Sequence, residues 1–360
     1  MPADQSGDAG ADPTAATEGA SDGLRGPAFD AALAVAAAAG PPAIRVLDIA
    51  AYLAPRQIPR DIFPPDELGE AGRNSSIEAL IACGLAMPDP LDGGEPGIQV
   101  PTTVQAEMRR RHSVAGQDAA RIRVALEAVT RAYPAGADAG EVRCWPVCER
   151  LDRHANAVLA FAPDEGEGAE ITSDLLHRLS HYRFARGRYE EAEPIVRRSG
   201  AVDEVLLGPD HPQVGQDRAN LAILLHEMGR TEEALQHIRK AMAIGEAELG
   251  PEHPLVAERY NILAMLLETL GRHSEADPFI RHALVTSEQV LGPDHPDTQA
   301  YRAVYDRVVA GMEAVARTDE AVEAGLAPAP LERLARRDLP PPPAPRQRGV
   351  LGRLLKGKQG

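Results

Sequence analysis

The sequence predicts an all-α fold centred on a solenoid of stacked helical hairpins. A hexapeptide, Leu-Gly-Pro-x-His-Pro, begins at Leu207, Leu249 and Leu291, and therefore recurs every 42 residues. A second marker keeps the same period: Gly187, Gly229 and Gly271 are each followed five residues later by an alanine. Aromatic residues make up only 4% of the chain, which suits helices that pack closely through small side chains. Self-similarity at this spacing is typical of a repeat architecture.

Two helices fit within each 42-residue unit. In the second unit the apolar pattern predicts helix A over 216–228 and helix B over 231–248. Gly229 can adopt the positive φ of a helix end, Thr231 is expected to cap helix B, and Pro251 cannot continue it. The predicted repeat domain spans 171–318, with units at about 173–206, 215–248 and 257–290 and a capping helix at 298–315. Terminal repeats are expected to be atypical.

These units resemble tetratricopeptide repeats of the long type found in kinesin light chains and in bacterial signal-transduction ATPases. The resemblance covers about residues 171–300 and rests on the hexapeptide and the glycine–alanine marker. It implies a non-enzymatic scaffold that binds a protein or peptide partner in its concave groove.

Helix-A positions are the candidate binding residues, because helix A lines the concave face of such a solenoid. In the resembling family, helix-A asparagines often bond a bound peptide, and Asn220 and Asn261 fall at those positions. The other predicted peptide-binding residues are Arg178, His181, Gln216, His226, Glu227, Glu258 and Met265. The alternative is that these polar groups only face water.

Residues 28–112 are predicted to form a winged-helix-like domain. Three helical segments, the third over 75–85 with Ser76 as a possible N-cap, precede two short apolar strands. The strands are expected at 85–87 and 98–100, around a Gly-rich turn at 92–95. The stretch 51–59 and Val104-Gln105-Ala106 resemble the winged helix after the nucleotide-binding domain of the NB-ARC/tetratricopeptide ATPases. That family usually has His-Arg-Leu where Pro101-Thr102-Thr103 stands here. The chain also has no Gly-x4-Gly-Lys-Ser/Thr phosphate loop, so the resemblance implies a winged helix and repeats without the ATPase.

Composition indicates what flanks these domains. Residues 1–26 are expected to be disordered, because they lack the apolar groups that offset ordering entropy. The tail 326–360, which is Pro-rich and basic, is also expected to be disordered. The tail's short basic amphipath could make weak membrane contact. Residues 116–170 are expected to form a degenerate helical hairpin, with helices at 118–133 and 145–161. With three cysteines and no signal peptide or long apolar run, we expect a cytoplasmic protein without a transmembrane segment.

The pattern does not favour a metal site. His211, His253 and His295 stand 42 residues apart, so they cannot converge on one ion and are expected to act in the repeat turns. Cys144, Cys148 and His154 offer too few ligands for a structural zinc ion, which is bound by four protein ligands.

Catalysis and nucleic-acid binding are also disfavoured. Asp174, His177 and His181 could mimic a catalytic pair, but no nucleophile or oxyanion motif accompanies them. We therefore expect no enzyme, cofactor or small-molecule substrate. The formal net charge is −16, which argues against nucleic-acid binding, and the basic run 109–112 is expected to be a solvated helix end. The alternatives are a regulatory subunit acting in trans on a nucleotide-binding partner and, third, a DNA-binding regulator.

Overall fold

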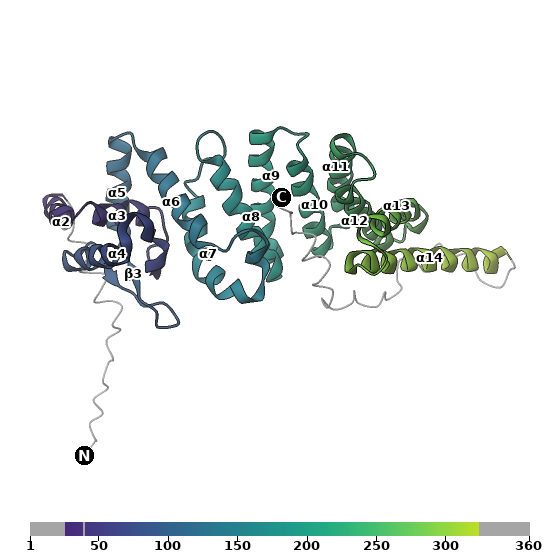
Figure 1. Cartoon of the computed structure of the whole chain (residues 1–360), viewed down its shortest axis with the longest axis horizontal. Helices are drawn as coiled ribbons and strands as arrows, with labels where there is room; N and C mark the ends of the chain where they lie inside the picture. Colours follow the sequence, from purple (N-terminus) through teal and green to yellow (C-terminus); the bar gives the residue numbers. More distant parts are fainter. Residues whose placement is uncertain (1–25, 39, 324–360) are drawn as a thin grey trace, which may run out of the picture. The chain divides into compact units, whose positions relative to one another are not determined.

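The computed structural model describes residues 26–38 and 40–323, which form two compact units. The first unit comprises the described residues up to Tyr133 together with Glu149–Pro163. The second comprises Pro134–Cys148 and the described residues from Asp164 onward. The predicted disordered termini lie outside the described residues, apart from Gly26. The fold is mainly helical, which confirms the predicted class (Figure 1).

The first unit is a small helical block. Its helices are α2 (Pro27–Ala38), α3 (Pro41–Ala50), α4 (Pro65–Ala82), α5 (Thr102–Val114) and α6 (Asp118–Ala132), with the 3-10 helix η1 (Arg60–Ile62). Helix α3 packs against α4, α5 and α6, and it buries Val46, Leu47 and Ile49 almost completely. This apolar face is the one that the sequence pattern marks.

A three-stranded antiparallel sheet completes this unit. Its strands are β1 (Ile58–Pro59), β2 (Met87–Pro88) and β3 (Gly97–Gln99), in the order β1-β3-β2. Met87 pairs with Gln99, and Ile58 pairs with Ile98. The first pairing confirms the predicted strands around the Gly-rich turn. The assignment of the whole block to the winged-helix class stays a prediction.

Helix α4 differs from its expected bounds. The sequence pattern predicts a helix from Ser75 with Ser76 as its N-cap, but α4 begins ten residues earlier, at Pro65. Gly69 interrupts the helix with φ 61° and ψ 159°. Because of this break, the residues before Gly69 do not continue the apolar pattern of the helix that follows. Ser76 lies inside the helix, where its Oγ donates to the carbonyl oxygen of Gly72 at 2.7 Å. The capping role is therefore wrong.

The second unit is built from helical hairpins. Its long helices are α8 (Ala169–Ala185), α9 (Tyr189–Leu207), α10 (Pro212–Glu227), α11 (Thr231–Leu249), α12 (Pro254–Thr269), α13 (His273–Leu291) and α14 (Pro296–Glu323). Each helix packs against the next one along the chain, within and between hairpins, and the pairs follow one another from teal to yellow in Figure 1. One hydrophobic core runs from Ala192 to Val308. The alanines of the sequence marker, Ala192, Ala234 and Ala276, are fully buried within it.

The segment before the repeats is divided between the two units. It contains the 3-10 helices η2 (Gly136–Gly140) and η3 (Val142–Cys144), followed by α7 (Trp145–Leu159). The unit boundary falls inside α7, between Cys148 and Glu149. Helix α6, the expected partner of α7, packs on α3, α5 and η1.

Glycine forms both kinds of turn in the repeats. Gly187, Gly229 and Gly271 have φ between 72° and 78° and close the turn between helix A and helix B. The glycine of the hexapeptide ends each helix B differently: Gly250, for example, has φ 81° and ψ 158°. That combination is essentially restricted to glycine. The glycine of the recurring Leu-Gly-Pro sequence is therefore required by the backbone conformation at the end of helix B.

The histidine of the hexapeptide caps the helix that follows it. His211 Nδ1 accepts a hydrogen bond from the backbone N–H of Gln213 at 3.1 Å, and His253 Nδ1 accepts one from Leu255 at 3.2 Å. His295 Nδ1 has the same relation to the N–H of Asp297, also at 3.2 Å. The expected role of these histidines in the turns is thereby confirmed and made specific.

The repeat helices differ from the predicted bounds at their starts. Helix A of the second unit begins at Pro212, four residues before Gln216, because the His-Pro pair starts the helix rather than preceding it. Thr231 is the first residue of α11 and makes no capping hydrogen bond, so the predicted N-cap is wrong. The closing helix α14 extends to Glu323, beyond the expected 298–315.

Candidate peptide-binding face

At each interface between successive hairpins, the same repeat position of helix A is buried. We call the contact between the first and second hairpins seam 1 and the next one seam 2. Asp217, Arg259 and Tyr301 stand 42 residues apart and are 3%, 1% and 6% exposed. One repeat position therefore carries an acid, a base and a phenol in turn. This variation inside a regular repeat places distinctive chemistry between the hairpins.

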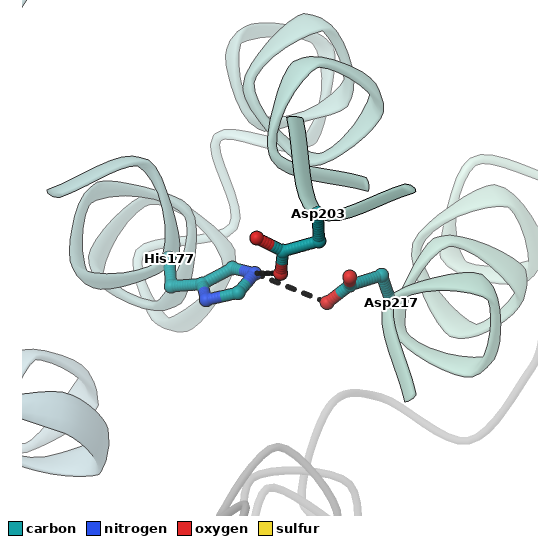
Figure 2. A group of neighbouring side chains, drawn as sticks. All are labelled: His177, Asp203 and Asp217. Carbon is teal, nitrogen blue, oxygen red and sulfur yellow. Dashed lines mark ion pairs between the residues drawn. The ribbon is translucent and has the colours of Figure 1, made fainter. Parts of the chain in front are cut away.

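Seam 1 holds a histidine whose Nε2 faces two aspartates (Figure 2). His177 Nε2 lies 3.0 Å from Asp217 Oδ1 and 3.4 Å from Asp203 Oδ2. Burial alone would lower the pKa of His177, but the nearby carboxylates, Asp217 first, outweigh burial and raise that pKa. Burial also raises the pKa of Asp203. Helices α8, α9 and α10 each contribute one of the three side chains.

Seam 2 holds a buried arginine. Arg259 NH1 donates to the carbonyl oxygen of Ala241 at 2.8 Å, and NH2 lies 3.4 Å from the carbonyl oxygen of Pro212. The guanidinium occupies space left by Gly215 and Gly245, since a Cβ at Gly245 would collide with it. Burial lowers the pKa of Arg259. Gly245 thus leaves the room that this guanidinium occupies, and Gly215 lies in close contact with it.

A small pocket opens beside seam 1. Its volume of about 10 Å³ is roughly that needed by one water molecule. Residues from α8 and α10 dominate its lining, among them His177, His181, Phe184, Asp217, Asn220 and Leu224. Two predicted peptide-binding residues, His181 and Asn220, therefore meet at this pocket, although they lie 39 residues apart in the sequence.

Other candidates on α8 and α10 are engaged with neighbours. Arg178 forms a two-pronged pair with Asp174 on its own helix, at 2.8 and 2.7 Å. Gln216 Nε2 donates to Asn220 Oδ1 at 3.1 Å, which leaves the amide N–H groups of Asn220 for another acceptor. Glu227 accepts from the hydroxyl of Tyr189 at 3.3 Å.

His226 belongs to a turn. Its Nδ1 lies 3.2 Å from the hydroxyl of Thr231, and burial lowers its pKa. This contact spans the turn between α10 and α11. The structure therefore places His226 apart from the pocket that His181 and Asn220 share.

The candidates on α12 fall into two groups. Asn261 is only 3% exposed, and its Oδ1 has no hydrogen-bond partner among the described residues. Glu258 and Met265 are partly exposed. Burial raises the pKa of Glu258 to about 7, with Arg259 acting in the opposite direction. A ligand can therefore reach Glu258 and Met265 directly, whereas Asn261 lies beneath the surface.

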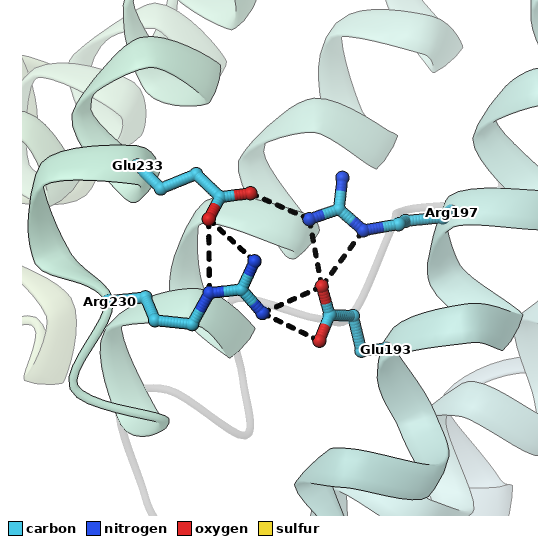
Figure 3. Close-up of polar contacts among 4 residues, drawn as sticks. All are labelled: Glu193, Arg197, Arg230 and Glu233. Atoms are coloured by element: carbon cyan, nitrogen blue, oxygen red, sulfur yellow. Dashed lines mark hydrogen bonds and ion pairs between the residues drawn. The ribbon is translucent and has the colours of Figure 1, made fainter.

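A ring of four charged side chains joins the first two hairpins (Figure 3). Three of them lie on helix B, and Arg230 lies in the turn before α11. Arg230 contacts Glu193 at 2.7 Å and Glu233 at 2.6 Å, and Arg197 contacts the same two glutamates at 2.8 and 2.7 Å. The Arg230–Glu233 pair recurs as Arg188–Glu191 and Arg272–Glu275. These pairs are a third marker with the 42-residue period, beside the hexapeptide and the glycine–alanine marker.

The basic run of the first unit is engaged in internal contacts. Arg109 donates to the carbonyl oxygen of Ala51, and Arg111 pairs with Glu107 and Asp30. His112 is 4% exposed and contacts Asp48 at 2.9 Å and Tyr52 at 3.0 Å. The expectation of a solvated helix end is therefore wrong for His112. These contacts hold the run within its own unit.

The candidate zinc residues have separate surroundings. Cys148 is buried, with Sγ 3.7 Å from the carbonyl oxygen of Ala139. His154 Nε2 lies 3.1 Å from the carbonyl oxygen of Gln57. Within residues 26–38 and 40–323, the side chains that come together as potential ligands of one ion are His177, Asp203 and Asp217. The sequence pattern groups His177 with Asp174 and His181 of its own helix and predicts neither of these aspartates as its neighbour.

Comparison with known proteins identifies the hairpins. The family model described as tetratricopeptide repeat matches residues 172–247 and, overlapping them, 217–289. These hairpins are tetratricopeptide repeats. The match covers α9 to α12 completely and most of α8 and α13. The buried seams described above therefore lie between successive tetratricopeptide repeats.

A curated relative is a nucleotide-binding leucine-rich repeat (NLR)-like protein from Hyaloscypha variabilis. It is 28% identical over 173 residues, which are 48% of this chain and 16% of the relative. This chain thus corresponds to a small part of that protein's length.

Solved structures similar to this chain include a putative kinesin light chain of Podosopora anserina with nearly identical tetratricopeptide-like repeats. It has 18% identity and a TM-score of 0.39, over 60% of this chain and 89% of that chain. Another is BtubC (BKLC) from P. vanneervenii, with 17% identity and a TM-score of 0.39, over 65% of this chain and 91% of that chain. None of the described helices is long and apolar enough to cross a membrane.

Proposed function

We propose that this protein is a non-enzymatic scaffold that binds a protein or peptide partner along the helix-A face of its tetratricopeptide repeats. The supporting observation is the meeting of His181 and Asn220 at one pocket between successive repeats. Tetratricopeptide solenoids present extended concave surfaces of this kind to their ligands. The partly exposed Glu258 and Met265 continue the proposed face on the next helix A.

The chemistry of this face favours a partner that offers both hydrogen-bond acceptors and positive charge. The side-chain oxygen of Asn220 already accepts a hydrogen bond from Gln216. Its amide N–H groups can donate to a peptide carbonyl. Glu258 makes no hydrogen bond or ion pair with the described residues, and burial raises its pKa to about 7. A lysine or arginine from a partner would stabilise its ionised form. We therefore expect a peptide segment with a basic residue.

The test uses the full chain as bait in affinity purification with quantitative mass spectrometry. The binding-face variant combines Asn220→Ala with Glu258→Gln, and it leaves Asn261 unchanged because that residue is buried. The control is Gln236→Ala, an exposed helix-B residue. A partner should be depleted roughly 10-fold or more by the binding-face variant, the equivalent of about 1.4 kcal/mol. It should be retained by the control.

Equal recovery of every captured protein by the wild type and both variants would reject the helix-A face. The three proteins should first be shown to have the same melting temperature, so that depletion reports binding rather than unfolding.

A second candidate function is regulation in trans of a nucleotide-binding partner. It is favoured by the match to part of a protein named as nucleotide-binding, together with the absence of a phosphate-loop motif from this sequence. On this proposal the captured partner carries a phosphate loop, and its nucleotide hydrolysis changes when this chain is added. A captured partner without such a loop would favour the general scaffold.

A further inference from the structure

The side chains of seam 1 have the arrangement of a small coordination site. His177 Nε2, a carboxylate oxygen of Asp203 and one of Asp217 all lie within 4.8 Å of one another (Figure 2). They come from α8, α9 and α10, so the group draws on two successive hairpins. Asp203 and Asp217 are only 4% and 3% exposed.

The charges of this group are unbalanced. Two buried carboxylates face a single imidazole, and no Arg or Lys ion pair reaches either carboxylate among the described residues. Asp217 Oδ2 is buried without a hydrogen-bond partner in that same part of the chain. At the equivalent positions of seam 2 stand Gly245 and Arg259, so that seam has a buried cation where seam 1 has buried anions. Buried charges are costly unless they are paired or coordinate a metal ion.

We propose that His177, Asp203 and Asp217 bind a divalent transition-metal ion such as Zn²⁺. Zinc bonds to imidazole nitrogen and carboxylate oxygen are about 2.0–2.2 Å long, so neighbouring ligand atoms stand about 3.3–3.6 Å apart around a tetrahedral ion and about 2.8–3.1 Å apart around an octahedral one. The observed 3.0 Å matches the octahedral spacing and the observed 3.4 Å the tetrahedral one, so the ligand atoms stand at coordination-sphere distances without matching a single regular geometry. A nitrogen ligand beside two oxygens favours Zn²⁺ or Co²⁺ over Mg²⁺ or Ca²⁺.

Neighbouring groups support the two carboxylates in the required orientation. Ser173 Oγ donates to Asp203 Oδ1, which leaves Oδ2 directed at the imidazole. Gln213 Nε2 donates to Asp217 Oδ1 at 3.2 Å. Such outer contacts orient metal ligands and tune affinity. The adjacent pocket has room for about one water molecule, which could serve as a fourth, exchangeable ligand.

When the metal ion binds, the imidazole of His177 gives up a proton. Ligation uses the lone pair of His177 Nε2, so a protonated imidazole must release that proton as the metal–nitrogen bond forms. The ion would then join three helices of two repeats in place of the present ion pairs. His177 and Asp217 line the same pocket as His181 and Asn220. The test of the metal site is nevertheless separate from that of the proposed peptide-binding function, because metal occupancy is measured on the isolated chain.

The experiment titrates the metal-free full chain with ZnCl₂ by calorimetry at neutral pH, and with CoCl₂ while visible absorption is recorded. The wild type should bind one ion at this site, show the visible bands of low-coordinate Co²⁺, and melt at a higher temperature with Zn²⁺. Asp217→Asn and Asp203→Asn should bind at least about 10-fold to 100-fold more weakly. The matched control, Asp174→Asn, lies on the same helix as His177 and should bind like the wild type.

Two results would overturn the proposal. One is a wild type that neither binds Zn²⁺ nor gains thermal stability from it; the cluster would then be an ion pair only. The other is equal binding by the wild type and Asp217→Asn, which would assign the ion to other histidines. If the aspartate variants fail to fold, His177→Gln with the Co²⁺ spectrum decides: unchanged bands exclude His177 as a ligand.

Discussion

At the scale of single residues, His154 is the clearest case of a titratable group held in its neutral form. It is fully buried, its Nε2–H donates to the carbonyl oxygen of Gln57, and its Nδ1 has no hydrogen-bond partner among the described residues. Burial lowers its pKa from 6.5 to about 4. The folded state therefore resists a proton that the unfolded state accepts.

This shift predicts a specific loss of stability in acid. Because the folded pKa lies below the unfolded one, the unfolded state binds more protons between pH 6.5 and 4, and stability falls as pH falls through that window. His154→Gln keeps an N–H donor without the titration. Between pH 7 and pH 4 the wild type should lose about 3 kcal/mol more stability than His154→Gln. Urea unfolding followed by circular dichroism measures this difference, and parallel curves for the two proteins would contradict it.

Arg259 is a buried cation, and we expect the volume of its side chain to stabilise seam 2 more than its charge does. Arg259→Met removes the charge and retains most of the volume between Gly215 and Gly245. We expect this variant to be as stable as the wild type within about 1 kcal/mol, or more stable, because a buried cation is expensive to desolvate. Arg259→Ala leaves a cavity and should cost about 2 kcal/mol or more. Thermal and urea unfolding compare the three proteins; equal losses for Met and Ala would show that the guanidinium hydrogen bonds dominate.

At the scale of elements, local chemistry decides where the repeat helices begin and end. Gly-Pro ends each helix B, and His-Pro begins α10, α12 and α14, so these boundaries follow from residues within six positions of one another. The sequence pattern predicts the turn, but it predicts a start of helix A at Gln216. It does not predict the histidine cap, because imidazole is not among the usual capping side chains.

This cap gives a prediction for α12. His253→Ala removes the acceptor of the Leu255 N–H and should lower the free energy of unfolding by about 1 kcal/mol. His253→Asn, which can accept the same hydrogen bond, should lose less than half of that. Chemical denaturation of the two variants and the wild type provides the measurement. Equal losses for Ala and Asn would mean that the imidazole acts through packing.

At the scale of the whole molecule, charged contacts join one repeat to the next. Glu193 belongs to the first hairpin, and Arg230 to the turn of the second. We expect Glu193→Gln and Arg230→Gln to be coupled: the double variant should lose less stability than the sum of the single losses. The coupling should shrink at 1 M salt, because the side chains are partly exposed and screened.

A double-mutant cycle of melting temperatures at low and high salt measures this coupling. A matched cycle of Glu193→Gln with Arg188→Gln serves as the control, since Arg188 pairs with Glu191 instead. Additive losses for Glu193 and Arg230 at low salt would show that the ring in Figure 3 contributes no cooperative stability.

The sequence by itself determined the repeat period, the hairpin turns and the apolar faces. Glycine at positive φ, proline at helix starts and small apolar residues at fixed intervals meet local requirements. Such requirements can be predicted from the sequence alone. It also identified His181 and Asn220, which share a pocket, as helix-A candidates. Only the tertiary structure decided that His177 meets Asp203 and Asp217, and that Asn261 is buried beneath the face it was expected to form. The reason is that these contacts join different helices, and the packing of those helices, not the spacing of residues within one repeat, sets the distances between their side chains.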